Sequence, residues 1–248
     1  MPNGFPNKPK ILRGAFVEFG LSLPPLLVVF QFNPVQLTRN RSITYSVPNK
    51  ATRERLNQDA NGPQVTRVEP QNLALRDFHK RSEYSDLTLL QKDQQVSVSE
   101  QTIGFDIRLD ATDKLNDRDA ITQQFGIAPR LATLELMVYP KGESLIGQAL
   151  GALLGSPGGF SFTRGENPPL ILFIWGRKRV LPVNINSMNI TETEFSTDLN
   201  PIRATVAVNL TVIEGKSLPY MYSKAMTEAM SVLNLANITE VANVVIPG

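Results

Sequence analysis

The side chains best suited to moving a proton in this 248-residue chain are one histidine, His79, and several closely spaced carboxylates. A histidine can act as a general base for a serine nucleophile, but no Gly-x-Ser-x-Gly elbow accompanies His79. The carboxylate pairs, such as Asp106 with Asp110 and Glu192 with Glu194, are typical of ordinary surface charge. We interpret His79 as a surface histidine and predict no catalytic residue, so the chain is expected not to be an enzyme.

The aspartate-rich segment from Asp110 to Asp119 contains the residue type that binds calcium. It lacks the glycine and the final glutamate of a calcium-binding hand, and we interpret it as loop and helix-capping sequence. The absence of cysteine excludes thiolate zinc sites and disulfides, which fits a reducing compartment. No Walker or Gly-x-Gly-x-x-Gly nucleotide loop occurs. We therefore predict no metal site and no cofactor.

Charge is balanced, with 25 lysines and arginines against 23 aspartates and glutamates, which argues against a general nucleic-acid binder. The basic residues nevertheless gather at two places in the sequence, which are Arg39, Arg41, Lys50, Arg53 and Arg55, and Arg177, Lys178 and Arg179. The first residues of each group follow an apolar run and are interpreted as a basic turn. Solvated loop charge is one interpretation, and contact with an acidic protein partner is the other.

No apolar run approaches the roughly 20 residues that a membrane helix needs. The first ten residues carry charge and proline but no apolar region of a signal peptide. We therefore expect cytoplasmic synthesis and no membrane span. The length of 248 residues allows one large β-rich domain or two small ones.

Two similar runs indicate how the chain is organised. Each starts with two prolines, Pro24-Pro25 or Pro168-Pro169, continues with apolar residues, and stops at a turn-forming residue. Proline at the entry and a turn residue at the exit are typical of a short buried strand. The runs, about Leu26 to Phe32 and Leu170 to Trp175, therefore predict two strands in two related halves.

Further strands are predicted from alternation of apolar and polar residues. They cover residues 12–19, 42–47, 103–109, 180–190 and 202–212. Within residues 42–47, Ile43, Tyr45 and Val47 share one face, which predicts one buried side. In residues 202–212 the second face is polar, and we expect it to meet water or another subunit.

Helices are predicted at three places. Residues 120–125 follow the aspartate-rich segment, and residues 129–139 begin with a proline suited to a first helical turn, with apolar side chains at 131, 134 and 138. After Ser217, a broad apolar stripe predicts a C-terminal helix, and it consists of Leu218, Met221, Tyr222, Ala225, Met226, Ala229, Met230 and Leu233. A methionine-rich face suits adaptable packing, either on the chain's own barrel, which we favour, or on a partner.

The predicted organisation is an N-terminal arm at 1–10, a β domain at 11–215, and a C-terminal helix and tail at 216–248. Two insertions, at about 48–95 and 141–168, interrupt the β domain. Because the first is long for an irregular segment, we expect an arm, an extended hairpin or a partner-contacting loop, with helical or extended structure near residues 73–90. The second contains glycines four apart and is expected to be a flexible insertion or a subunit-packing helix.

Five short sequences, in a fixed order over roughly residues 10–215, carry a family resemblance. They are Phe30-Gln31-Phe32-Asn33-Pro34; Ile103-Gly104-Phe105-Asp106 with Leu109-Asp110; Pro168-Pro169 with Phe173 and Trp175-Gly176; Glu192 with Phe195; and Leu199-Asn200-Pro201-Ile202-Arg203-Ala204. Together they resemble the tube-like adaptor proteins of contractile injection systems, which are phage-tail-like particles.

The resemblance implies a mainly β fold with α: a tube-protein-like β-barrel or packed antiparallel sheets, with a flanking helix, long arms and a C-terminal helix. It also implies a structural baseplate component, a tube initiator, that forms a hexameric ring. The ring would join the spike hub to the inner tube, contact baseplate wedge proteins, and assemble in the cytoplasm within the particle. Family members often add a C-terminal peptidoglycan-binding module, whereas we expect the residues after Val212 to form one helix and a tail.

Two alternatives stay open. The chain could be the repeating inner-tube subunit, although the long insertions argue against a compact repeat. It could also be a β-sandwich module that binds carbohydrate or a surface through Trp175 and nearby tyrosines, although we expect Trp175 to be buried. The expected interface residues are Arg39, Arg41, Arg177, Lys178 and Arg179 for electrostatic contact, and Met221, Met226 and Met230 for packing.

Overall fold

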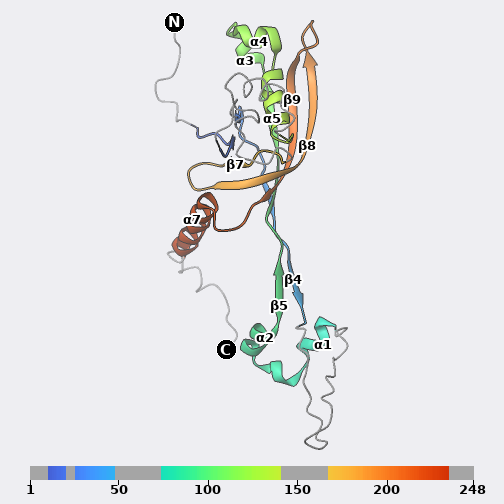
Figure 1. Cartoon of the computed structure of the whole chain (residues 1–248), viewed down its shortest axis with the longest axis vertical. Helices are drawn as coiled ribbons and strands as arrows, with labels where there is room; N and C mark the ends of the chain where they lie inside the picture. Colours follow the sequence, from blue (N-terminus) through green and yellow to red (C-terminus); the bar gives the residue numbers. More distant parts are fainter. Residues whose placement is uncertain (1–10, 21–25, 48–73, 141–166, 235–248) are drawn as a thin grey trace, which may run out of the picture. The chain divides into compact units, whose positions relative to one another are not determined.

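The computed structural model describes residues 11–20, 26–47, 74–140 and 167–234 (Figure 1). The chain divides into two compact units, one formed by residues 1–40 with 100–248 and the other by residues 41–99. The predicted arm at 1–10, most of the predicted insertion at 141–168, and the tail after residue 234 lie outside the described residues.

The first unit is built on a seven-stranded antiparallel sheet in the order β2-β1-β7-β8-β9-β6-β3. Its strands are β1 (Ala15–Glu18), β2 (Leu27–Val29), β3 (Thr38–Asn40), β6 (Thr102–Asp110), β7 (Ile171–Ile174), β8 (Val180–Phe195) and β9 (Pro201–Val212). The mainly β fold with helices that the sequence predicts is confirmed. The two similar apolar runs form β2 and β7, which pair with opposite edges of β1.

Four phenylalanines show that this sheet curls over on itself. β1 and β6 are four strand positions apart in the sheet order, which in a flat sheet would separate them by about 19 Å at roughly 4.8 Å per strand. The ring centroids of Phe16 in β1 and Phe105 in β6 are only 6.0 Å apart. Phe30 and Phe173 lie within 6.4 Å of each other and complete the cluster. The two ends of the sheet therefore pack against each other around one core.

The alternation predicted for residues 103–109 and 202–212 is confirmed. The core-facing side chains of β6 and β9 are buried, and they are Ile103, Phe105, Ile107, Leu109, Ala204, Val206, Val208, Leu210 and Val212. Gly14, just before β1, is required by close packing, because a β-carbon there would lie 2.7 Å from the ring of Phe30 and 2.8 Å from that of Trp175.

Three short helices follow β6: α3 (Thr112–Asn116), α4 (Ala120–Phe125) and α5 (Ala128–Leu136). The predicted helices at 120–125 and 129–139 are confirmed, and Asp119 caps α4 by accepting from the N–H of Thr122 at 2.9 Å. On α5 the buried residues include Leu131 and Leu134 as predicted, but Met137 rather than Val138 completes the core face. The carbonyl of Pro201, at the start of β9, accepts from Ile127 N–H and fixes these helices to the β8–β9 hairpin.

The C-terminal helix is α7 (Leu218–Asn234), as predicted. Its contact with the sheet is made to the start of β8, and Ser223 is its one buried residue. The predicted apolar stripe is largely exposed, so the expectation that this stripe packs on the chain's own barrel is wrong. Helical period alone identifies an apolar face but does not say whether that face or its neighbour meets the core.

The second unit contains a two-stranded ribbon, β4 (Ile43–Ser46) with β5 (Gln95–Val98), and the helical segments α1 (Leu75–His79), η1 (Ser82–Ser85) and α2 (Leu87–Asp93). The predicted strand at 42–47 is confirmed, but its predicted buried side is wrong. Ile43 and Tyr45 are 49% and 50% exposed, because the ribbon has no second layer among the described residues. The strand also belongs to this unit rather than to the main sheet.

One predicted turn is a strand. The segment Arg39-Asn40-Arg41 was expected to be a basic turn, but Arg39 and Asn40 belong to β3, which pairs with β6 at the edge of the main sheet. Short polar residues without apolar alternation give no strand signal, and here pairing with a long neighbour decides the conformation. The second basic segment is a turn as predicted: it joins β7 to β8, with Trp175 N–H donating to the carbonyl of Arg179 at 2.8 Å.

Candidate functional site

β8 carries a long strand edge without a partner in the described part of the chain. It pairs with β7 only through Val183, whereas its pairing with β9 continues to Phe195. Successive residues of a strand direct their backbone groups to opposite edges. Because Asn189 and Thr191 face β9 in this register, Met188, Ile190 and Glu192 direct their N–H and C=O groups away from it. An open edge of this kind is a template for pairing with another chain.

β6 carries a shorter open edge on the other side of the same three strands. β3 covers it only from Thr102 to Gly104. The alternation of bond directions leaves Asp106 and Arg108 with backbone groups that point away from β9, which agrees with the N–H of Ala111 donating to the Ile202 carbonyl of β9 at 2.9 Å. A groove of about 1020 Å³ lies along this edge, with residues 32–36 as its second wall.

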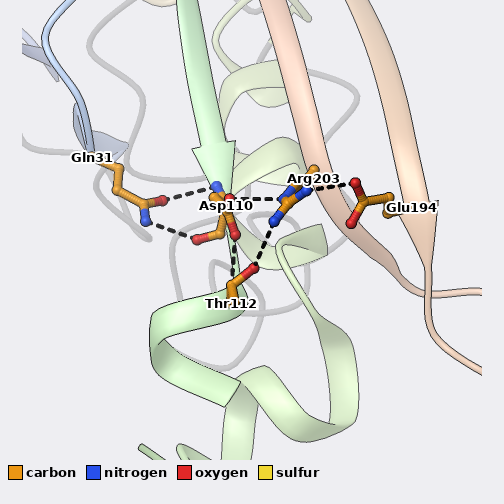
Figure 2. Close-up of polar contacts among 5 residues, drawn as sticks. All are labelled: Gln31, Asp110, Thr112, Glu194 and Arg203. Atoms are coloured by element: carbon orange, nitrogen blue, oxygen red, sulfur yellow. Dashed lines mark hydrogen bonds and ion pairs between the residues drawn. The ribbon is translucent and has the colours of Figure 1, made fainter. Parts of the chain in front are cut away.

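Gln31, just before the residues of this second wall, reaches across to Asp110 at the end of β6, as Figure 2 shows. Its amide NH₂ donates to the carbonyl of Asp110 at 2.8 Å, and its amide oxygen accepts from Asp110 N–H at 3.0 Å. Arg130 of α5 donates to the same amide oxygen at 3.0 Å. The side chain therefore makes the pair of hydrogen bonds that a neighbouring strand would make. We call this pair of bonds the clamp. It joins the end of β2 to the end of β6, where no backbone pairing exists.

The carboxylate of Asp110 organises a polar network beside this clamp (Figure 2). It accepts from Arg203 Nε at 2.8 Å and from Thr112 N–H at 2.7 Å, and Arg203 Nη1 also lies 2.5 Å from Glu194 Oε1. Burial acts to raise the pKa of Asp110, but the hydrogen bonds from Thr112 and the charge of Arg203 outweigh it and lower the pKa. The hydrogen bond to Asp110, then the charge of Asp110 and that of Glu194, raise the pKa of Arg203. All these groups are paired, so the network orders the hairpin end.

The outer face of β6, β9 and β8 is made of small or polar side chains. Cross-strand neighbours on this face are Thr102, Thr211 and Asn184; Gly104, Asn209 and Ser187; Asp106, Ala207 and Asn189; Arg108, Thr205 and Thr191; and Asp110, Arg203 and Thr193. A face without large apolar side chains has no drive to pack on a protein layer. It is suited to permanent contact with water.

The structure brings the basic turn and α7 together. Tyr222 Oη donates to the carbonyl of Arg177 at 2.8 Å, and Lys178 Nζ lies 3.4 Å from the sulfur of Met230. The hydroxyl of Ser223 accepts from the N–H of Val180 at 2.8 Å and donates to its carbonyl at 2.6 Å. The basic turn therefore lies along one side of α7.

The other predicted interface residues lie on three different elements or units. Arg39 is exposed on β3, and its charge acts on Arg179: burial first and the charge of Arg39 second lower the pKa of Arg179. Arg41 is the first residue of the second unit. Met221 is exposed on α7, and Met226 is half-buried.

His79 and Trp175, which the sequence offered for catalysis and for stacking, belong to different units of the chain. His79 is exposed at the end of α1, where its nearest aromatic neighbour is the ring of Phe78 at 6.0 Å. Trp175 is half-buried rather than buried, and its ring stacks on Phe173 at 6.0 Å between centroids. In the part of the chain that the structure describes, no cluster of three metal-ligating residues occurs and no helix is long and apolar enough to cross a bilayer.

No protein-family model matches the chain, and no curated protein is significantly similar to it. The sequence pattern predicts no role for Gln31 or Arg203, and it predicts only surface charge and loop or capping chemistry for Asp110. The position of Gln31 between two phenylalanines could have predicted its role. A polar side chain inside a buried apolar run needs a hydrogen-bond partner.

Proposed function

We propose that this chain is a structural subunit of a hexameric ring at the baseplate of a contractile injection system. The ring joins the spike hub to the inner tube, initiates tube assembly, and contacts baseplate wedge proteins. It acts by matching surfaces and not by catalysis, and it assembles in the cytoplasm within a phage-tail-like particle. The resemblance described above supplies the family, and the two open strand edges supply the physical support.

The open edge of β8 carries the argument for a ring. It lies on one side of the β8-β9-β6 group, and the open edge of β6 lies on the other. If β8 of one copy pairs with β6 of the next, every copy uses one edge of each kind. Contacts of this head-to-tail type produce a ring when the rotation closes. Closure also removes the exposed edges that would otherwise lead to uncontrolled association.

The side chains on these edges are compatible with such pairing. On β8, Met188 and Ile190 point to the core side, where they pack against the core. Asn189 and Thr191 point to the polar side. A neighbouring sheet added at this edge would therefore keep an apolar inner face and a polar outer face. In a ring, the polar faces together would line a water-filled channel.

A proline at Glu192 tests the ring proposal. The N–H of Glu192 points away from β9, so Glu192→Pro removes no hydrogen bond within the chain but blocks pairing at the open edge. We expect the wild-type chain to form six-subunit rings at high concentration and the variant to remain a folded monomer, as measured by light scattering and circular dichroism. Glu192→Lys is the matched control, because it removes the carboxylate but retains the N–H.

Three outcomes would count against the proposal. Rings that form equally well with Glu192→Pro would exclude pairing at this edge, and a wild-type chain that remains monomeric at all concentrations would exclude self-assembly. The number of copies per purified particle separates the adaptor from the repeating tube subunit: six support the adaptor, and hundreds would favour the tube subunit.

A further inference from the structure

α7 has two distinct faces. One packs against the sheet through Ser223 and half-buried Met226. The second is apolar and exposed, with Leu218 86% and Val232 64% exposed. Because an α-helix has about 3.6 residues per turn, Leu218 and Val232 lie roughly 140° and 180° around the helix from Ser223. The core of the first unit therefore cannot cover it.

The spacing of the exposed face fits contact with another helix. Residues Leu218, Tyr222, Ala225, Ala229 and Val232 follow one another at intervals of four, three, four and three. This is the spacing of a coiled-coil seam, along which each side chain of one helix inserts between side chains of the other. The two alanines in the middle allow close approach of a second helix. Met221 and Leu233 widen the seam with further exposed apolar surface.

The basic turn supplies charge along one flank of this seam. It is attached to the helix through the bond from Tyr222 to the carbonyl of Arg177, and through the contact of Lys178 with Met230. No ion pair of the described residues involves Arg177, Lys178 or Arg179. Arg179 also lies within the electrostatic influence of Arg39, another cation. The flank thus has unneutralised positive charge next to an uncovered apolar stripe.

We propose that this surface docks an acidic amphipathic helix of another protein. Apolar side chains of the partner occupy the seam of α7, and its carboxylates face the basic turn. A second copy of α7 fits less well, because symmetric pairing would bring two sets of like charges together. The assignment is independent of the ring proposal, since neither the seam nor the basic turn belongs to the open strand edges.

Two synthetic helical peptides test this assignment on the full-length chain. Both carry the same leucine seam, and the flanking positions are glutamate in one and lysine in the other. We expect the glutamate peptide to bind with a fluorescence-anisotropy signal that weakens at high salt, and the lysine peptide not to bind. Lys178→Glu should weaken binding by about tenfold, while Lys224→Glu, the same charge change away from the turn, should have little effect.

A second pair of variants separates the apolar seam from the rest of the helix. Ala225→Glu places a charge in the seam and should abolish binding, whereas Ser231→Glu on the polar side should not. Equal binding of both peptides would overturn the charge argument, and no binding of either would overturn the proposal. Self-association of the chain that Ala225→Glu abolishes would identify a second copy as the occupant and would likewise overturn it.

Discussion

At the scale of single residues, the curled sheet depends on a side chain that imitates a strand. Gln31 completes the hydrogen bonding of Asp110 where β2 ends and no backbone is available. The two groups that it satisfies are partly buried, and a buried backbone group without a partner costs more than one exposed to water. A single amide therefore joins the segment after β2 to the end of β6.

Replacing Gln31 with alanine should destabilise the fold. Gln31→Ala leaves the N–H and C=O of Asp110 and the guanidinium of Arg130 without this partner, and we expect the free energy of unfolding to fall by about 1–3 kcal/mol. Urea denaturation measures this change. Gln36→Ala is the control, because that amide makes only an exposed contact of 3.5 Å with Thr38; an equal loss in both variants would refute the role of the clamp.

At the scale of elements, long strands and short ones have different origins. β6 and β9 alternate over many residues and bury one face of each, so burial alone specifies them. β1, β2 and β3 have three or four residues each and depend on pairing with longer neighbours. α7 is attached in a third way, through a serine hydroxyl that caps the free backbone of Val180.

Removing that hydroxyl should loosen α7 from the sheet. Ser223 is 4% exposed, so Ser223→Ala leaves both backbone groups of Val180 without their partner in a partly buried place, at a cost of about 1–3 kcal/mol. Hydrogen exchange should show faster exchange at Val180 and in α7, with β6 and β9 unchanged. Thr227→Ala, which removes only an i to i−4 bond within the helix, should leave exchange near the wild-type rate. Unchanged exchange in Ser223→Ala would contradict this attachment.

At the scale of the whole molecule, the chain separates into two units along its sequence. Residues 41–99 leave the main sheet after β3 and return before β6, and Asn40 pairs directly with Thr102. The ribbon of the second unit has four apolar residues, Ile43, Tyr45, Val96 and Val98, each about half exposed. Two-stranded ribbons are marginal in water without a further layer, whereas the first unit has a complete aromatic core.

The first unit should therefore fold without the second. Replacing residues 41–101, which are the second unit with Glu100 and Gln101, by Asn-Gly joins the paired residues Asn40 and Thr102 through a two-residue turn and makes β3 and β6 a hairpin. The replacement also removes the bond from Val212 N–H to the carbonyl of Gln101. We expect this shortened chain to retain a cooperative thermal transition and the near-ultraviolet signal of buried aromatic residues. A transition that is lost or strongly broadened would show that the second unit supports the first.

Several features were predictable because their signals are local. The alternation in residues 103–109 and 202–212, the capping aspartate Asp119 and the proline-initiated α5 each depend on neighbours a few residues away. The buried side predicted for residues 42–47 was wrong, since alternation shows that a face is apolar but not that a second layer exists. The strand β3 was missed because its polar residues pair only through a partner about sixty positions away.

The sequence by itself determined the mainly β character, the strands β6 and β9, and the presence of a C-terminal helix with an apolar stripe. Only the tertiary structure decided which stripe of α7 meets the sheet, which strand edges remain open, and that the basic turn lies against the helix. The physical reason is the separation along the chain of the residues that interact. Periodicity reports which side chains share a face, whereas coverage of a face or an edge depends on segments far away in the chain, such as Gln31 and Asp110, which lie 79 residues apart.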